Sequence, residues 1–176
     1  MVVDKIAVAK KGARREDDLL MTLGLGYLGQ FLGQRMNELV LAGGKRKGFT
    51  QMRASHGYVI QHLVETDSPV ARTGSDLARR MGVTQQAASK AIAELVRLGV
   101  VEVTASEDRR AKQVSLSTSG WAAVQWARRY RARLEERLLR GVGANQYAQA
   151  QETLRECLTL LGGVDRIRSR RIRQPE

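Results

Sequence analysis

The segment from Thr73 to Gly99 constrains the fold of this chain more than any other part. The hydroxyl of Thr73 lies three residues before Asp76, a spacing that caps the first turn of a helix and places a carboxylate at its positive end. Gly82 suits the left-handed residue that ends such a helix, and Thr84 suits the cap of another helix that Gly99 ends. The spacing therefore predicts two short helices joined by a tight turn.

The second of these helices, expected to run to Leu98, has two different sides. At helical spacing, the apolar side carries Ala88, Ala91, Ile92 and Leu95. The first turn and a half of the opposite side is polar, with Gln85, Gln86, Ser89 and Lys90. We therefore expect one side in a core and the other available to a partner.

A pair of strands is predicted directly after the second helix. Val101 and Val103 alternate with polar residues, and so do Val114 and Leu116. A polar loop from Ala105 to Lys112 joins them, and its tip reads Glu107-Asp108-Arg109-Arg110. Helix, turn, helix and hairpin in this order indicate a winged helix-turn-helix.

This arrangement suits duplex DNA. A helix fits the major groove, where glutamine pairs with adenine, lysine with guanine, and a small residue such as Ala87 meets a thymine methyl. At the hairpin tip, Asp108 can orient Arg110 for the narrow minor groove. The alternative for the tip is a solvated hairpin end. The candidate DNA-binding residues are Thr73, Thr84, Gln85, Gln86, Ala87, Ser89, Lys90, Asp108, Arg109, Arg110 and Lys112.

The charge of the chain agrees with a polyanionic partner. Thirty Lys and Arg against 18 Asp and Glu give a net charge of +12, which favours nucleic acid over a membrane surface. Basic residues also mark an N-terminal arm, 1–16, and a C-terminal tail, 166–176. Each end is either a solvated segment or an arm that follows a phosphate backbone.

Long helices are expected on both sides of the winged segment. A helix over Leu19 to Leu41 has two apolar lines, which predicts burial on two sides, and Gly43-Gly44 should end it. Thr50 should cap a helix to about Glu65, followed by a turn at 67–69. Further helices are expected from Thr118 to about Arg140 and along the stripe from Tyr147 to Leu161. The fold class is mainly α with a small β-hairpin wing.

Other classes of function lack support. One cysteine, Cys157, excludes an intramolecular disulfide, and two histidines leave little for a metal site. The G-x-G-x-x-G match at Gly24–Gly29 lies within helical periodicity and lacks the later acidic residue of a dinucleotide site. We expect Gly26, Gly29 and Gly33 to allow close helix packing instead. No catalytic constellation is evident. We expect a cytoplasmic, nucleoid-associated protein without enzymatic activity, cofactor or membrane span.

The run from about Phe49 to Val124 resembles the MarR family of winged-helix transcriptional regulators. The resemblance rests on three stretches: residues 75–86, residues 94–102, and the wing with the leucine and glycine that follow it, residues 108–120. The segment Arg53-Ala54-Ser55-His56-Gly57 is similar to one found in a subset of the family. The resemblance implies a homodimer on a pseudo-palindromic site and, in many members, a small aromatic anion as effector. The matching ligand wall would include Tyr27, Phe31, Arg53, His56 and Trp121.

The sequence departs from the family pattern in the wing. The family often has a basic residue where Val103 stands and a proline before Asp108, whereas this wing lacks proline and is one residue short. The first helix also lacks the reactive cysteine of peroxide-sensing members, so thiol sensing is not expected.

These observations predict a dimeric, sequence-specific, DNA-binding transcriptional regulator, a repressor that a small aromatic ligand releases from its operator. The alternatives are a low-specificity, chromatin-organising DNA-binding protein and a winged-helix protein–protein adaptor. The expected parts are the arm 1–16, a first dimerisation helix and loop 17–48, the winged helix 49–118, C-terminal dimerisation helices 119–165 and the tail 166–176.

Overall fold

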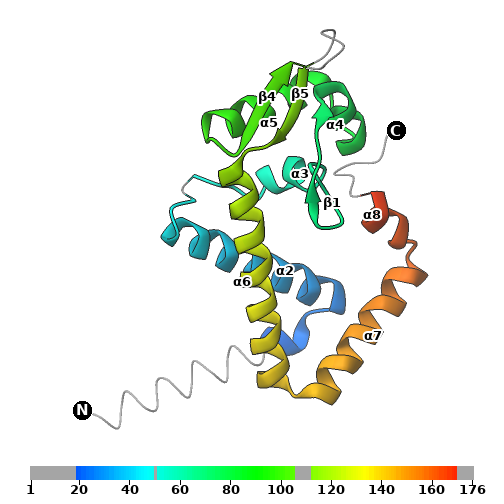
Figure 1. The fold of residues 1–176 in the computed structure, drawn as a ribbon. Helices are drawn as coiled ribbons and strands as arrows, with labels where there is room; N and C mark the ends of the chain where they lie inside the picture. Colours follow the sequence, from blue (N-terminus) through cyan, green and yellow to red (C-terminus); the bar gives the residue numbers. More distant parts are fainter. Residues whose placement is uncertain (1–18, 50, 106–111, 170–176) are drawn as a thin grey trace. The chain divides into compact units, whose positions relative to one another are not determined.

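The computed structural model describes residues 19–49, 51–105 and 112–169 (Figure 1). Residues 1–39 and 40–176 form two units. The expected N-terminal arm, the wing tip and the end of the C-terminal tail lie outside the described residues. Helices dominate, with two small antiparallel sheets, which confirms the expected fold class.

The first unit is helical and exposes its apolar side chains. Residues 19–22 are helical, Leu23 and Gly24 interrupt the helix, and α2 then spans Leu25–Arg46 and continues into the second unit. The prediction of one helix from residue 19 to residue 41 therefore missed the interruption at Leu23 and Gly24, and it ended the helix before Arg46. Tyr27 and Phe31 stack on each other with ring centroids 6.4 Å apart and stay 61% and 54% exposed.

Gly43 and Gly44 do not end this helix, contrary to the prediction. Both glycines are buried inside α2. A Cβ on Gly43 would lie 2.9 Å from Cη2 of Trp126 and 3.1 Å from Cζ of Tyr130. Their missing side chains thus serve close packing against an aromatic pair, and the helix ends only at Arg46, before Gly48 with φ +93°.

The helix expected from Thr50 to Glu65 is much shorter. Helix α3 spans only His56–Ile60, and the chain then forms β1, Val64–Glu65, which pairs antiparallel with β2, Ser68–Pro69. Thr66 turns this small hairpin with φ +51°. Val59, Leu63 and Val64 are nevertheless buried, so this segment contributes apolar side chains to the core although most of it is not helical.

The winged helix follows the prediction closely. Helix α4 spans Gly74–Met81, α5 spans Gln85–Arg97, β4 spans Val101–Ala105 and β5 spans Lys112–Leu116. A third strand that was not predicted, β3 at Arg72–Thr73, pairs with β5 and gives the order β3-β5-β4. The register places Val103 opposite Val114. The core beneath it consists mainly of Val59, Leu63, Leu77, Met81, Ile92, Leu95, Val101, Val114 and Leu116.

Two long helices follow the sheet. Helix α6 spans Thr118–Val142, α7 spans Ala144–Leu160, and a short α8 at Val164–Ser169 occupies the start of what was expected to be a basic tail. No described residue of α7 is buried, and Leu154 and Leu158 are 36% and 43% exposed. The apolar stripe predicted for this helix is therefore present but uncovered.

Candidate nucleic-acid interface

The N-terminal end of α5 is the centre of the candidate interface. Thr84 caps this helix, and its hydroxyl oxygen accepts the backbone N–H of Ala87 at 3.2 Å. Ala88, Ile92 and Leu95 are buried on one side of α5. Burial of this side fixes the rotation of the helix and turns the polar side outward.

The candidate residues of α5 are all exposed. They are Thr84 at the cap and Gln85, Gln86, Ala87, Ser89 and Lys90 in the first turns. Residues four apart lie on the same side of a helix, so Gln85 lies in line with Ser89 and Gln86 in line with Lys90, and these two neighbouring rows form the polar face. Backbone N–H groups at such a helix end also favour phosphate. This end can thus contact both base edges and the DNA backbone.

Helix α4 is positioned by a cluster of arginines around Asp76. Thr73 caps α4 by accepting the Asp76 N–H at 3.1 Å, as predicted from the spacing. Partial burial raises the pKa of Asp76, but Arg80 and Arg79 outweigh it, so the net pKa is lowered. Arg80 Nε lies 2.8 Å from the carboxylate, Arg79 also binds it, and Arg72 lies at 3.4 Å.

Arg72 extends this cluster to the small hairpin. Its guanidinium binds Glu65 and donates to the backbone carbonyl of His62 at 2.7 Å. Only 12% of its side chain is exposed. The positive charges of this cluster are therefore used to join β1, β3 and α4. Sequence reasoning missed this role although Arg72, Arg79 and Arg80 lie only three or four residues from Asp76. The contact of Arg72 with Glu65 depends on the β1–β2 hairpin, which was not predicted.

A second polar cluster joins α3 to the recognition helix α5. The Arg53 backbone N–H donates to Nδ1 of His56 at 3.2 Å, so Nε2 carries the proton of the neutral ring. This Nε2 lies 3.3 Å from Oε2 of Glu94, and the Arg53 guanidinium binds the other oxygen of the same carboxylate. His56, with Arg53, lowers the pKa of Glu94 against a smaller opposing effect of burial.

The start of α6 packs against the turn that follows α5. Ser117 caps α6 by accepting the Gly120 N–H at 3.0 Å and donates to the Gly99 carbonyl at 2.6 Å. Ser119 donates to the same carbonyl at 2.7 Å. A Cβ on Gly120 would collide with the carbonyl oxygen of Val100. These contacts hold the start of α6 against the turn that follows α5.

The other DNA candidates are placed only in part. Thr73 is half-buried at the α4 cap, and Lys112 is exposed at the start of β5. Asp108, Arg109 and Arg110 lie outside the described residues. The minor-groove role of the wing tip stays a prediction.

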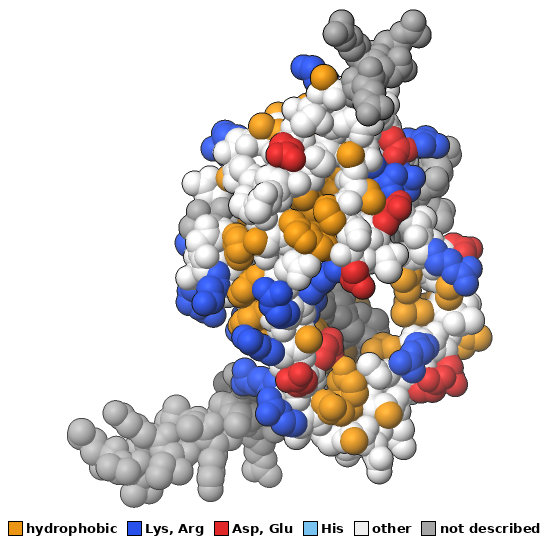
Figure 2. Space-filling view, viewed as in Figure 1, with side chains coloured by type: hydrophobic (Ala, Val, Ile, Leu, Met, Phe, Trp, Pro, Cys, Tyr) orange, Lys and Arg blue, Asp and Glu red, His pale blue; other side chains and the backbone are white. Residues whose placement is uncertain are grey.

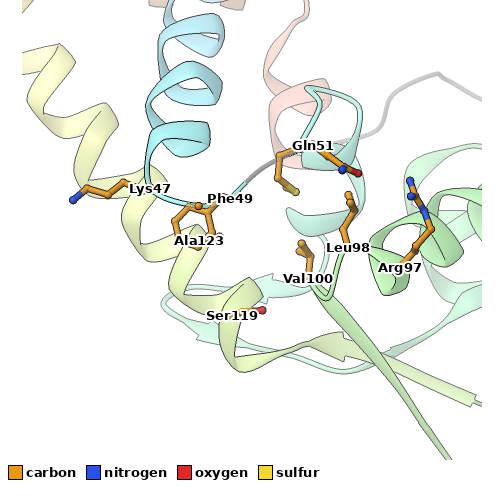
Figure 3. Close-up of a pocket in the computed structure, with 10 residues that line it drawn as sticks. Lys47, Phe49, Gln51, Arg97, Leu98, Val100, Ser119 and Ala123 are labelled. Carbon is orange, nitrogen blue, oxygen red and sulfur yellow. The ribbon is translucent and has the colours of Figure 1, made fainter.

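A cavity of about 480 Å³ lies beside the C-terminal end of α5 (Figure 3). Its lining comes from the segment after α2, the end of α5 with the turn that follows it, and the start of α6. Apolar lining side chains are Phe49, Met52, Leu98, Val100 and Ala123, and polar ones are Lys47, Gln51, Arg97 and Ser119. No pattern along the chain pointed to this cavity, because its lining comes from three separate segments.

The expected ligand wall does not line this cavity. Tyr27 and Phe31 belong to the first unit. His56 is only 2% exposed and is engaged with Glu94, Arg53 binds the same carboxylate, and Trp121 packs against the core. The assignment of these five residues to a ligand stays a prediction.

Two further features bear on the class of protein. Within residues 19–49, 51–105 and 112–169, no helix is both long enough and apolar enough to cross a membrane. Over the same ranges, no three His, Cys, Asp or Glu side chains are grouped to hold a metal ion.

Comparison with known proteins agrees with the fold. A family model described as MarR family matches residues 47–111, the segment that contains α3 to β4. No curated protein matches the chain. The family match, together with solved structures of the same fold, confirms the resemblance to the MarR family.

Solved structures share the fold at low sequence identity. YusO protein from Bacillus subtilis is 20% identical, with a TM-score of 0.61, over 81% of this chain and 96% of that one. MarR from E. coli is 21% identical, with a TM-score of 0.60, over 77% and 97%. MepR of Staphylococcus aureus, a transcription regulator of the multidrug efflux pump MepA, is 19% identical, with a TM-score of 0.62, over 79% and 99%. A MepR–DNA complex also matches, with a TM-score of 0.57.

Proposed function

We propose that this chain, whose residues 47–111 carry the MarR-family winged helix, is a sequence-specific, duplex-DNA-binding transcriptional regulator that represses its target genes as a homodimer. The exposed polar end of α5 carries this proposal. Gln85, Gln86 and Lys90 are exposed together at a capped helix end whose opposite side is buried. These residues would read base edges in the major groove, and Arg110 would enter the adjacent minor groove.

Uncovered apolar side chains support a homodimer. Tyr27, Phe31, Leu154 and Leu158 are between 36% and 61% exposed, and no described residue of α7 is buried. Exposed apolar surface of this extent marks an interaction site, and most homo-oligomers are two-fold dimers. A second copy covering these helices would present two α5 ends to one duplex. The operator would then be pseudo-palindromic, with half-sites about 10 bp apart.

The cavity beside α5 supports a response to a small effector. Its apolar lining and its two cationic residues, Lys47 and Arg97, suit an aromatic body with a carboxylate. Since Leu98 and Ser119 line it from α5 and from α6, a bound effector would alter the seat that joins the two helices. We propose that effector binding releases the protein from DNA, and that the protein acts in the cytoplasm on the nucleoid.

Selection of bound duplexes from a random pool tests the proposal. The expected result is a dyad-symmetric sequence whose affinity is far above that of random duplex and falls steeply with salt. Gln86→Ala should relax the base preference, whereas Arg35→Gln, remote from α5 in sequence, should not. Recovery of no preferred sequence by the wild-type protein would contradict the proposal.

A low-specificity DNA-binding function is the second candidate. It is favoured by exposed, unneutralised cations at the end of α2 and along α6. A small ratio of specific to random-duplex affinity in the same selection would indicate it. The polar face of α5 argues against a protein–protein adaptor, which would show no salt-sensitive binding to duplex.

A further inference from the structure

A group of exposed cations lies outside the candidate recognition site. It comprises the end of α2 with the following residue and one side of α6, and we name it the α2–α6 basic surface: Lys45, Arg46, Lys47, Arg129, Arg133, Arg137 and Arg140. Figure 2 shows Lys and Arg side chains gathered over α6 and beside the end of α2. Gly43 and Gly44 pack against Trp126, which brings the three cations of the α2 end to α6.

These cations are not neutralised by the described residues around them. None of the seven forms an ion pair with another described side chain, whereas Arg53, Arg72, Arg79, Arg80 and Arg128 all do. Of the acidic residues on α6, Glu135 is bound by the Tyr147 hydroxyl, and Glu136 is exposed among the arginines. The surface thus keeps a clear excess of positive charge.

The surface extends away from the end of α5 that would read DNA. The start of α6 is seated on Gly99 and Val100, at the end of α5 opposite Thr84. Arg133 and Arg140 follow Thr118 by 15 and 22 residues, which corresponds to roughly 22 and 33 Å along a helix that rises 1.5 Å per residue. Phosphates at these arginines would therefore belong to another segment of duplex than the bases read by Gln86.

The chemistry of the surface favours a nucleic acid backbone. Arg129, Arg133, Arg137 and Arg140 recur at spacings of three and four, which puts them in a row roughly 17 Å long. Arginine is suited to phosphate oxygens because its planar fork donates two parallel hydrogen bonds. A membrane-binding helix needs a free apolar side. Around Trp126 the apolar side of α6 is occupied instead, since this ring packs on Gly43 and Phe49.

We propose that the α2–α6 basic surface is a second, sequence-independent binding site for duplex DNA, which lets the protein hold two duplex segments at once. The proposal rests on the DNA-binding function proposed above and extends it from reading an operator to bridging. The partner is the phosphate backbone, so this site should show strong salt dependence and no base preference.

A two-duplex capture assay tests this proposal. The selected duplex is fixed on beads and saturated with full-length protein, and capture of a labelled random duplex is measured. The test variant is Arg129→Gln, Arg133→Gln and Arg137→Gln together. The control variant, Arg35→Gln, Arg155→Gln and Arg168→Gln, removes the same charge from arginines that are paired with a neighbouring carboxylate. Circular dichroism and sedimentation verify the fold and the oligomeric state of both variants.

We expect the test variant to lose at least 10-fold in capture of the second duplex while its affinity for the fixed duplex changes less than 3-fold. The control variant should capture like the wild type. Equal capture by the test variant would overturn the proposal, because the two α5 ends of a dimer would then account for bridging. The proposal would also be overturned if these arginines bound anionic phospholipid vesicles and the protein captured no second duplex.

Failure of the proposed function gives a different result. In that case the selection yields no preferred sequence, and the capture assay is run with random duplex on the beads. Loss of capture in the test variant would still support the second site there, and unchanged capture would overturn it.

Discussion

Nε2 of His56, on α3, lies 3.3 Å from Oε2 of Glu94, on the recognition helix α5. His56 is 2% exposed, and Arg53 binds the other oxygen of the same carboxylate. This contact joins α3 to α5 through the buried His56 side chain. Its consequence for stability can be measured through the ionisation of Glu94.

Glu94→Gln should reduce stability at neutral pH and have little effect in acid. His56 and Arg53 lower the pKa of Glu94 in the folded protein. An acid with a lowered folded pKa stabilises the protein above its unfolded pKa, which is about 4.3 for glutamate, and this contribution is lost as the pH falls through the folded value. Urea unfolding of both proteins at pH 7 and at an acidic pH below the folded pKa of Glu94 measures the difference. An equal difference at both pH values would contradict the assignment.

Thr84→Ala should cost about 1 kcal/mol of folding stability, because the first turn of α5 loses its side-chain cap. Thr84→Ser keeps the hydroxyl and should retain most of that stability. Denaturant unfolding of the two variants separates the cap from the loss of a methyl group. Identical losses would show that the cap bond is not responsible.

Gly43→Val should destabilise the protein by roughly 1–3 kcal/mol, since the new side chain must displace the Trp126 ring. Gly33→Ala is the matched control, because it lies in the same helix and a Cβ there would point into open space. It should not destabilise the protomer, and the helix preference for alanine would add up to about 1 kcal/mol. Thermal unfolding followed by tryptophan fluorescence measures both.

Leu154→Asp with Leu158→Asp should convert the dimer to monomer while the winged helix stays folded. Both side chains lie on the uncovered stripe of α7. Gln149→Asp with Gln151→Asp adds the same charge at exposed polar positions of this helix and should leave the dimer intact. Sedimentation equilibrium decides the matter, and a wild-type protein that is monomeric at micromolar concentration would refute the prediction.

Gln86→Ala and Arg110→Ala should affect DNA binding in different ways. Loss of a bidentate base contact costs about 1–3 kcal/mol of discrimination at one position, so the glutamine variant should relax base preference. Loss of the Arg110 cation from the minor groove should weaken binding to many sequences, because the negative potential of the groove attracts it whatever the sequence. Mobility-shift titrations over several salt concentrations distinguish the two. Unaltered affinity and preference in both variants would overturn the groove assignment.

The winged helix could be predicted because its signals are local. Thr73 with Asp76, the Gly82 turn and the Thr84 cap each act within a few residues, and the structure has all three. The strand at Arg72 and Thr73 was missed because two residues have no periodicity and pair with β5, which lies about 40 residues later. Gly43 misled the prediction because a glycine can end a helix or admit an aromatic ring, and the deciding Trp126 is distant in sequence.

The part of the candidate DNA surface that lies on α5 was likewise predictable, because its residues belong to one helix. The cavity and the His56–Glu94 contact each combine separate segments, so no spacing along the chain reveals them. The resemblance to a known family placed His56 in a ligand wall. In the structure, the His56 side chain contacts Glu94.

The glycine at position 120 limits how this protein can be re-engineered. Its backbone rests directly on the Val100 carbonyl, while Ser117 and Ser119 hold Gly99. One kind of chimera replaces α5 with the corresponding helix of another protein and joins it before Gly99. The new helix would then have to place Gly99 and Val100 so that the contacts with Ser117, Ser119 and Gly120 still form. Exchange of specificity between such proteins should therefore succeed only when the graft runs from the cap of α5 through the first turn of α6.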